Sequence, residues 1–182
     1  MSAWVLLLRG INVGGKGKLP MANLRALLDT LGAQNVTTYI QSGNAVFTGE
    51  IDPADFAPRL EAAIETHHGF RPSALVLSGA RFRQIADAFP WPEAWETPAQ
   101  GHIWFLASPP DRPDLAALED LASPSERFTL TQQALYLHAP DGIGRSKLAA
   151  KAERLIGVPA TARNLGSVSK LIALCAALPG RP

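Results

Sequence analysis

Residues 35–47 read NVTTYIQSGNAVF, and this stretch decides the fold. Residues 35–40 are rich in β-branched and aromatic side chains, and residues 45–47 are apolar again. Gly43 stands between the two runs, where Ser42 and Asn44 supply side chains typical of turns. The stretch therefore predicts a β-hairpin around a glycine turn.

Helices are predicted on both sides of this hairpin. Leucines recur at helical spacing over 24–31, and an apolar stripe over 56–64 follows the cap formed by Asp52-Pro53. Further out, 4–8 (WVLLL) and 74–77 (ALVL) are continuous apolar runs, typical of strands buried on both faces. The order is βαββαβ, which is the ferredoxin-like unit.

The same order is predicted a second time after residue 101. The predicted elements are a strand over 102–106, a helix over 115–121, two strands joined near Gln132-Gln133, a helix over 146–156, a short strand over 158–162 and a last helix over 168–175. We therefore predict an α+β fold of two tandem ferredoxin-like halves with antiparallel sheets and an extra C-terminal helix. The predicted parts are an N-terminal half (1–78), a connecting helix with a proline-rich linker (79–101) and a C-terminal half (102–182).

Composition favours a globular, cytoplasmic protein. The 182 residues are 47% hydrophobic and 18% charged, which excludes disorder of the whole chain. No apolar run approaches the ~20 residues of a membrane span, and we expect neither a leader sequence nor a membrane partner. The single cysteine, Cys175, excludes internal disulfides and multi-cysteine metal sites, and its place on an apolar stripe predicts a core position. We expect no cofactor.

Charge is segregated along the chain, although the net charge is only +1. Residues 1–28 carry four basic and no acidic side chains, and residues 141–182 carry seven basic and two acidic ones. The middle, 29–140, carries six basic and fourteen acidic side chains. Two basic ends either converge on one face that attracts anions or form an ordinary solvated surface. The near-neutral total argues against a tight, sequence-independent DNA binder.

The loop 10–17 (GINVGGKG) resembles a phosphate-binding loop and follows a predicted strand. Its backbone N–H groups and Lys16 suit an anion. However, Gly17 stands where that motif needs a hydroxyl, and Pro20 delays the helix. The loop is therefore either a looser anion-binding loop, with Gly14 and Gly15 allowing close approach, or a structural loop with positive φ angles.

Two further segments are candidate contacts. In the predicted hairpin, Gln41, Ser42 and Asn44 either contact a ligand beside Tyr39 or serve an ordinary turn. Near the C-terminus, Arg163 either binds a phosphate or carboxylate or pairs with an acidic side chain of the middle segment. Asn164 or Ser167 caps the last helix. Lys170 faces away from that helix's apolar stripe.

Four strings of residues together resemble a known family. They are 8–16 (LRGINVGGK), 36–47 (VTTYIQSGNAVF), 146–148 (SKL) and 160–164 (ATARN), followed by Val168 and Lys170-Leu171. In this order and spacing the chain resembles the bacterial family called domain of unknown function 1697 (DUF1697). The resemblance implies two ferredoxin-like α+β halves and no established activity.

The leading functional hypothesis is a basic site for a polyanionic ligand, nucleotide-like or nucleic acid, at the junction of the two halves. Its predicted ligand-binding residues are Arg9, Asn12, Gly14, Gly15, Lys16, Gln41, Ser42, Asn44, Arg163, Asn164 and Lys170. These residues fall in predicted loops and helix starts, where function commonly resides. One alternative is an enzyme acting on a phosphorylated small molecule, although no nucleophile or metal-ligand pattern is present. The other is a protein-interaction module.

Overall fold

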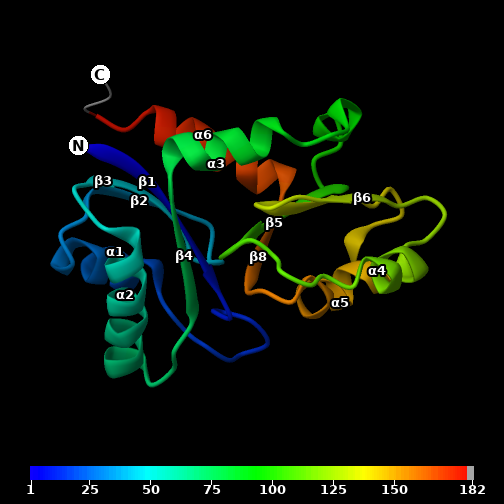
Figure 1. The fold of residues 1–182 in the computed structure, drawn as a ribbon. Coiled ribbons are helices and arrows are strands. Elements are labelled where there is room, and N and C mark those ends of the chain that lie inside the picture. The colour runs from blue at the N-terminus through cyan, green and yellow to red at the C-terminus, as the bar shows by residue number, and fades with distance from the viewer. Residues whose placement is uncertain (180–182) are drawn as a thin grey trace. The chain divides into compact units, whose positions relative to one another are not determined.

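The computed structural model describes residues 1–179. The first elements are β1 (Ser2–Arg9), α1 (Met21–Thr30), β2 (Gln34–Tyr39), β3 (Asn44–Gly49), α2 (Pro53–His68) and β4 (Ser73–Ser78). Helix α3 (Gly79–Asp87) and the 3₁₀ turn η1 (Pro92–Trp95) follow. The remaining elements are β5 (Gly101–Leu106), α4 (Leu115–Leu121), β6 (Arg127–Leu130), β7 (Ala134–His138), the 3₁₀ turn η2 (Ile143–Arg145), α5 (Lys147–Ile156), β8 (Ala160–Asn164) and α6 (Leu165–Ala176). The order βαββαβ thus occurs twice (Figure 1).

Both sheets have four antiparallel strands in equivalent order. The first sheet is β2-β3-β1-β4 and the second is β6-β7-β5-β8. In each sheet the first and third strands of the unit lie side by side in the centre. The predicted α+β class with two tandem ferredoxin-like halves is therefore confirmed.

The chain divides into two compact units, which are described separately. The first unit comprises Met1–Arg83 together with the segment that begins at Lys170, and the second comprises Gln84–Ser169. Helices α3 and α6 each contribute residues to both units. Among the helices of the described chain, none combines the length and the apolar character that crossing a membrane requires.

The core of the first unit lies between its sheet and helices α1 and α2, which cover one sheet face (Figure 1). From β1, Leu6 and Leu8 point into this core, and Phe47 of β3 stacks on Phe56 of α2 with 5.3 Å between ring centroids. The alternate β1 side chain Leu7 is also fully buried. Burial on both faces explains why β1 reads as a continuous apolar run.

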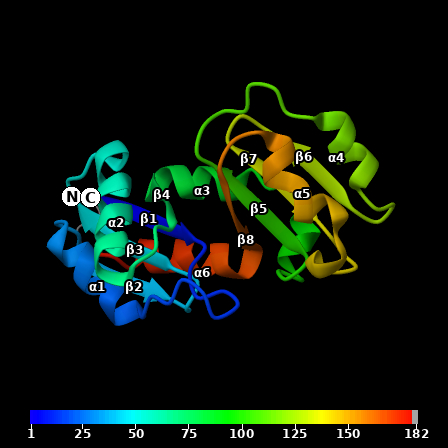
Figure 2. The same ribbon diagram turned by 90° about the horizontal axis from the view of Figure 1, so that it is seen from below.

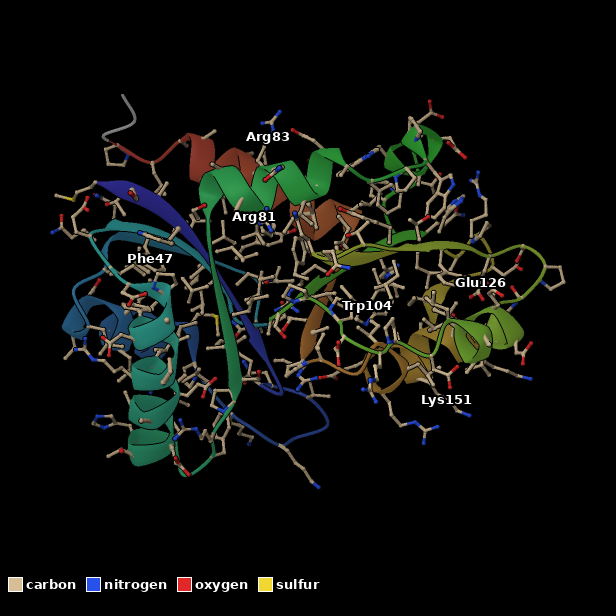
Figure 3. The ribbon with its side chains drawn as sticks, in the orientation of Figure 1. Phe47, Arg81, Arg83, Trp104, Glu126 and Lys151 are labelled. Carbon is tan, nitrogen blue, oxygen red and sulfur yellow. The ribbon has the colours of Figure 1, made fainter. Side chains whose placement is uncertain are left out.

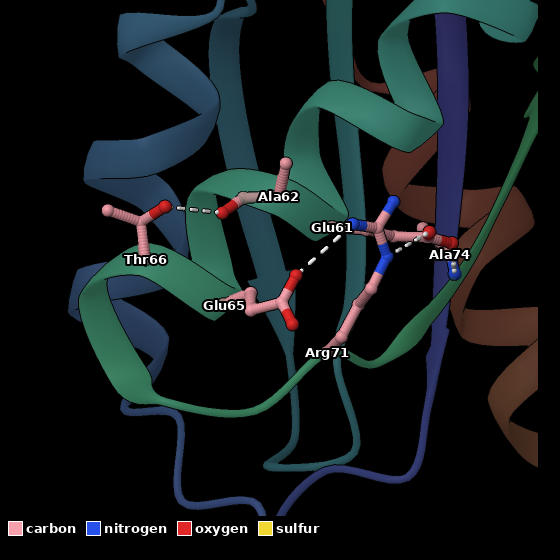
Figure 4. Close-up of polar contacts among 6 residues, drawn as sticks. All are labelled: Glu61, Ala62, Glu65, Thr66, Arg71 and Ala74. Atoms are coloured by element: carbon pink, nitrogen blue, oxygen red, sulfur yellow. Dashed lines mark hydrogen bonds and ion pairs between the residues drawn. The ribbon is translucent and has the colours of Figure 1, made fainter.

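Helix α2 is fixed at both ends. Asp52 accepts a hydrogen bond from the Ala54 backbone N–H at 3.0 Å, and Gly69 ends the helix with a φ of 74°. In the middle of the helix the Glu61 carboxylate accepts from the backbone N–H of Ala74 in β4 at 2.9 Å (Figure 4). Arg71 donates to Glu61 at 3.3 Å and to Glu65 at 3.2 Å.

The second unit has its core between its sheet and helices α4 and α5, which lie on one face of that sheet (Figure 2). Trp104 of β5, labelled in Figure 3, packs in this core with Leu137 of β7. Helix α4 contributes Leu118, and α5 contributes Leu148 and Ile156. The Ser146 hydroxyl caps α5 by accepting from the Ala149 N–H at 3.0 Å, as the predicted start at residue 146 requires.

The predicted proline-rich linker contains an aromatic cluster. Phe89 makes edge-on contacts with Trp91, Trp95 and Tyr136, with ring centroids 5.5, 6.1 and 5.8 Å apart. Tyr136 of β7 donates its hydroxyl hydrogen to the carbonyl of Ile85 at 2.8 Å. The segment that follows α3 is therefore packed onto the second sheet rather than extended in solvent.

Candidate functional site

The glycine-rich loop after β1 is a tight hairpin. Val13 and Lys16 exchange backbone hydrogen bonds of 3.3 and 3.0 Å, and Asn12 donates its N–H to the Gly17 carbonyl at 2.9 Å. Gly14 and Gly15 occupy the tip with φ angles of 56° and 76°. Positive φ at both central positions is the pattern of a type I′ turn, which explains the glycine pair.

This hairpin differs from the loop of nucleoside triphosphatases. In that motif the lysine opens a helix whose N-terminus holds the phosphates. Here α1 begins at Met21, directly after Pro20, and Lys16 lies in the hairpin. Of the two interpretations left open by the sequence, the positive φ angles confirm the structural role of the glycines. The tip of the hairpin is exposed, and the binding of an anion there stays a prediction.

Asn12 joins two of the predicted segments. Its side-chain amide donates to the Gln41 carbonyl at 2.7 Å and to the Leu19 carbonyl at 3.0 Å, and its side-chain oxygen accepts from the Leu19 N–H at 3.0 Å. A side chain at Gly43 would place its Cβ 2.6 Å from the Leu8 side chain, so the turn also approaches β1 closely. We call residues 9–18 and 40–43 together the two-loop surface.

Asn44, a predicted ligand contact, holds the turn of the two-loop surface. It is fully buried, and its amide donates to the Ser42 hydroxyl at 2.8 Å and to the Tyr39 carbonyl at 3.3 Å. Ser42 is half-buried, whereas Gln41 is exposed. The Asn44 amide therefore helps to hold the turn, and the Gln41 side chain is exposed; contact of either residue with a ligand stays a prediction.

The two-loop surface is basic and carries exposed apolar side chains. Arg9, Lys16 and Lys18 are exposed. Val13 is 68% exposed and Ile40 is 51% exposed. Ile40 also has a φ of 50°, which is strained for a β-branched residue. Strain of this kind, about 1–3 kcal/mol, concentrates at functional sites, and sequence reasoning missed it because Ile40 has the composition of an ordinary strand residue.

The C-terminal candidates occupy the junction of β8 and α6. Burial lowers the pKa of Arg163 to about 10, so its guanidinium, which donates to the Ala162 carbonyl at 2.8 Å, stays protonated at neutral pH. Asn164 caps α6 by accepting from the Ser167 N–H at 2.8 Å, which decides between the two predicted caps. Lys170 is exposed, as predicted. A site shared by these residues and the two-loop surface stays a prediction.

Sequence reasoning missed a polar cluster of the second unit. Arg127 forms an ion pair with Glu93 and donates to Nδ1 of His138 at 2.8 Å. Its guanidinium carbon lies 5.2 Å from the centre of the Trp91 ring, which stacks on His138. The hydrogen bond from Arg127 lowers the pKa of Glu93. Burial, followed by the charge of Arg127, lowers the pKa of His138.

Part of this cluster had a signal in the sequence. A hairpin turning between Gln132 and Gln133 pairs residue 127 with residue 138, and the structure has this register. Glu93 and Trp91 come close to Arg127 only because the segment after α3 packs there. No local sequence pattern predicts this packing.

His102 is a buried titratable group of the second unit. It lies in β5, as predicted, and its Nδ1 has no hydrogen-bond partner among the described residues. Burial lowers the pKa of His102 to about 4, and a hydrogen bond with the Gln100 backbone only partly opposes this effect. The imidazole is therefore neutral at pH 7.

The fold and these surfaces define a class: α+β proteins built from two ferredoxin-like units, with a basic hairpin loop after the first strand. Within that class the chain belongs to the family described as "Protein of unknown function (DUF1697)", which it matches over residues 1–136. The resemblance carried by the first two sequence strings is thus confirmed.

A solved structure agrees with this assignment. The chain is similar to the conserved bacterial protein SP0830 from Streptococcus pneumoniae, with a TM-score of 0.71 and 28% sequence identity. The similarity covers 96% of this chain and 98% of that protein, so both ferredoxin-like units are included. No curated protein matches the chain.

Proposed function

We propose that the protein binds a polyanionic ligand, nucleotide-like or nucleic acid, through the two-loop surface. The observation that carries the proposal is the clamp made by Asn12, which holds the glycine hairpin against the turn at Gln41. The clamp fixes the shape of an exposed basic loop before a ligand arrives. A preorganised loop loses less conformational entropy on binding than a flexible one.

Backbone groups support an anionic ligand. Within the described residues, the N–H groups of Gly14 and Gly15 make no hydrogen bond, and both glycines are exposed. Successive backbone N–H groups in a turn can form the kind of concavity that binds anions. Exposed Lys16 and Lys18 add positive charge on either side of Gly17.

The exposed apolar side chains favour a ligand with flat, apolar faces in addition to phosphates. Val13 and Ile40 belong to the two segments that Asn12 joins. A nucleobase has such a face, whereas inorganic phosphate has none. We therefore favour single-stranded nucleic acid over a simple anion, with Arg163 and Lys170 as predicted contributors from the C-terminal region.

The test uses a fluorescently labelled twelve-nucleotide uridine RNA and fluorescence anisotropy over a range of salt concentrations. We expect affinity to fall linearly in log–log terms with added salt. The double variant Lys16→Gln/Lys18→Gln removes two cations and is expected to reduce the slope by about 1.4, at ~0.7 per phosphate contact of a single strand.

The matched control is Lys151→Gln, which removes an exposed lysine of α5 in the second unit (Figure 3). It is expected to leave both affinity and slope unchanged. Equal losses in the control and the double variant, or binding independent of salt, would contradict the proposal. A parallel titration with ADP, with and without Mg²⁺, separates a nucleotide ligand from a nucleic acid.

A further inference from the structure

The segment that follows α3 lies beside β6 of the second sheet (Figure 1), and Arg127 of β6 joins the two. Arg127 forms an ion pair with Glu93 of η1, and its guanidinium carbon lies 5.2 Å from the centre of the Trp91 ring. Its third partner is Nδ1 of His138 on the neighbouring strand β7, at 2.8 Å. The Arg127 cluster comprises Trp91, Glu93, Arg127 and His138.

The contact between Arg127 and His138 fixes the protonation state of the imidazole. A guanidinium has N–H donors and no acceptor, so Nδ1 of His138 must be the ring nitrogen without a proton. The other ring nitrogen, Nε2, then carries the hydrogen of a neutral imidazole. A proton added to Nδ1 would place one N–H against another and a second positive charge beside the first. The contact at 2.8 Å therefore exists only while His138 is neutral.

Among the described residues, the charged groups that act on His138 are Arg127 of β6 and Glu93 of η1. The residue opposite His138 on β5 is Gly101, and the ring stacked on His138 is that of Trp91, so neither adds a charge. Burial, followed by the charge of Arg127, lowers the pKa of His138, and the charge of Glu93 partly opposes them. The assembled cluster thus favours the neutral imidazole.

The turn η1 provides backbone amides whose order depends on the cluster. The N–H groups of Ala94, Glu96 and Thr97 donate to carbonyls within the same segment, at 3.1, 3.1 and 3.2 Å. A single short turn of this kind has little stability in isolation. Its order therefore depends on the contacts that hold the segment on the sheet, and Arg127 makes two of these contacts.

We propose that the Arg127 cluster is a pH-sensitive switch, which holds the segment 91–97 on the second sheet while His138 is neutral and releases it when His138 is protonated. A proton taken from solvent ends the hydrogen bond to Arg127 and sets two cations against each other. Arg127, displaced from the imidazole, no longer holds Trp91 and Glu93 in place. The switch shares no residue with the two-loop surface, so either proposal can fail without the other.

The experiment is amide hydrogen exchange of the full chain at about pH 7.5 and about pH 5.5, measured by mass spectrometry on peptides that cover 92–97. Rates corrected for the pH dependence of intrinsic exchange give the opening constant of the segment. We expect this constant to rise by up to about tenfold at the lower pH, because the released imidazole, with its ordinary pKa of ~6.5, takes up the proton first. An opening constant equal at both pH values would overturn the proposal.

His138→Gln separates the effect of charge from that of shape. The glutamine carbonyl accepts from Arg127 at every pH, so the segment is expected to open equally little at both pH values. The matched control is His67→Gln, which removes an exposed histidine of α2 in the first unit and is expected to keep the full response. A full response to pH in His138→Gln would assign the switch to another group and refute the proposal.

Peptides of β5 distinguish local release from unfolding of the whole second unit. Protonation of buried His102 destabilises the unit as a whole, so it raises the opening constant of β5 as well as that of the segment. Release through His138 raises the opening constant of the segment alone. Equal rises in β5 and in the segment would mean that the unit unfolds as a whole, and the proposed switch would be wrong.

Two charge variants test the arrangement through the pKa of His138, which proton NMR titration of the ring measures. Arg127→Gln removes the cation and is expected to raise this pKa, whereas Glu93→Gln removes the anion and is expected to lower it. Damage to packing alone does not produce opposite shifts. Shifts in one direction, or no shift in either variant, would contradict the placement of the two charges around His138 and with it the proposal.

Discussion

His102 couples the stability of the second unit to pH. Its imidazole is buried in β5, and its ring centroid lies 6.2 Å from that of Trp104. Burial lowers the pKa of His102 to about 4 from an ordinary value of 6.5. As pH falls below 6.5 the unfolded chain takes up the proton first, so the free energy of unfolding decreases until about pH 4.

The predicted loss is about 3 kcal/mol between pH 7 and pH 4, from ~1.36 kcal/mol for each pH unit of the shift. Urea unfolding at a series of pH values measures it. His102→Gln is expected to flatten this part of the profile, whereas His67→Gln, at an exposed position in α2, is expected to preserve it. A profile equally steep in His102→Gln would assign the pH dependence to other groups.

At the scale of elements, the glycine hairpin contains two kinds of glycine. Gly15 has a φ of 76° with open space around it, whereas Gly17 has a φ of 62° and would place a Cβ 2.5 Å from the Gly10 carbonyl oxygen. An alanine at the first position meets only backbone strain, but at the second it also collides with backbone.

We expect Gly15→Ala to lower the free energy of unfolding by about 1 kcal/mol and Gly17→Ala to lower it by about 3 kcal/mol. Urea unfolding of both variants checks the difference. Similar losses would mean that the base of the hairpin is less closely packed than its geometry indicates.

Secondary structure was predictable where residue periodicity determines it. The stretch 35–47 forms the expected hairpin, because β-branched and aromatic residues and a glycine turn act within one short segment. The last strand was placed too early, over 158–162, whereas β8 runs Ala160–Asn164. Its position depends on pairing with β5, where His102 faces Asn164, and local composition carries no information on such long-range register.

The contacts of candidate residues within the protein were not predictable from the sequence. Asn12 was expected to contact a ligand, which stays a prediction, and the structure adds that its side chain joins two loops. The cluster around Arg127 needs the aromatic segment after α3 to fold back onto β7, which depends on packing between distant residues. The spacing of residues along the chain predicts such contacts only when both residues lie in one hairpin.

At the scale of the whole molecule, the repeated topology gives each unit its own helix-covered sheet and its own core. The predicted site residues follow this division, because the hairpin loop belongs to the first unit and Arg163 to the second. A polyanion long enough to contact both would depend on cations from both. The predicted joint site can therefore be tested one unit at a time.

Arg163→Gln is expected to lower the affinity for the twelve-nucleotide RNA and to reduce the salt slope by about 0.7, because one phosphate contact is lost. Arg163→Lys keeps the positive charge and controls for damage to the packing around this half-buried side chain. Combined with Lys16→Gln, the loss is expected to exceed that of either variant alone. If Arg163→Gln retains full affinity and slope while Lys16→Gln does not, the ligand contacts the two-loop surface without Arg163, and the predicted joint site is wrong.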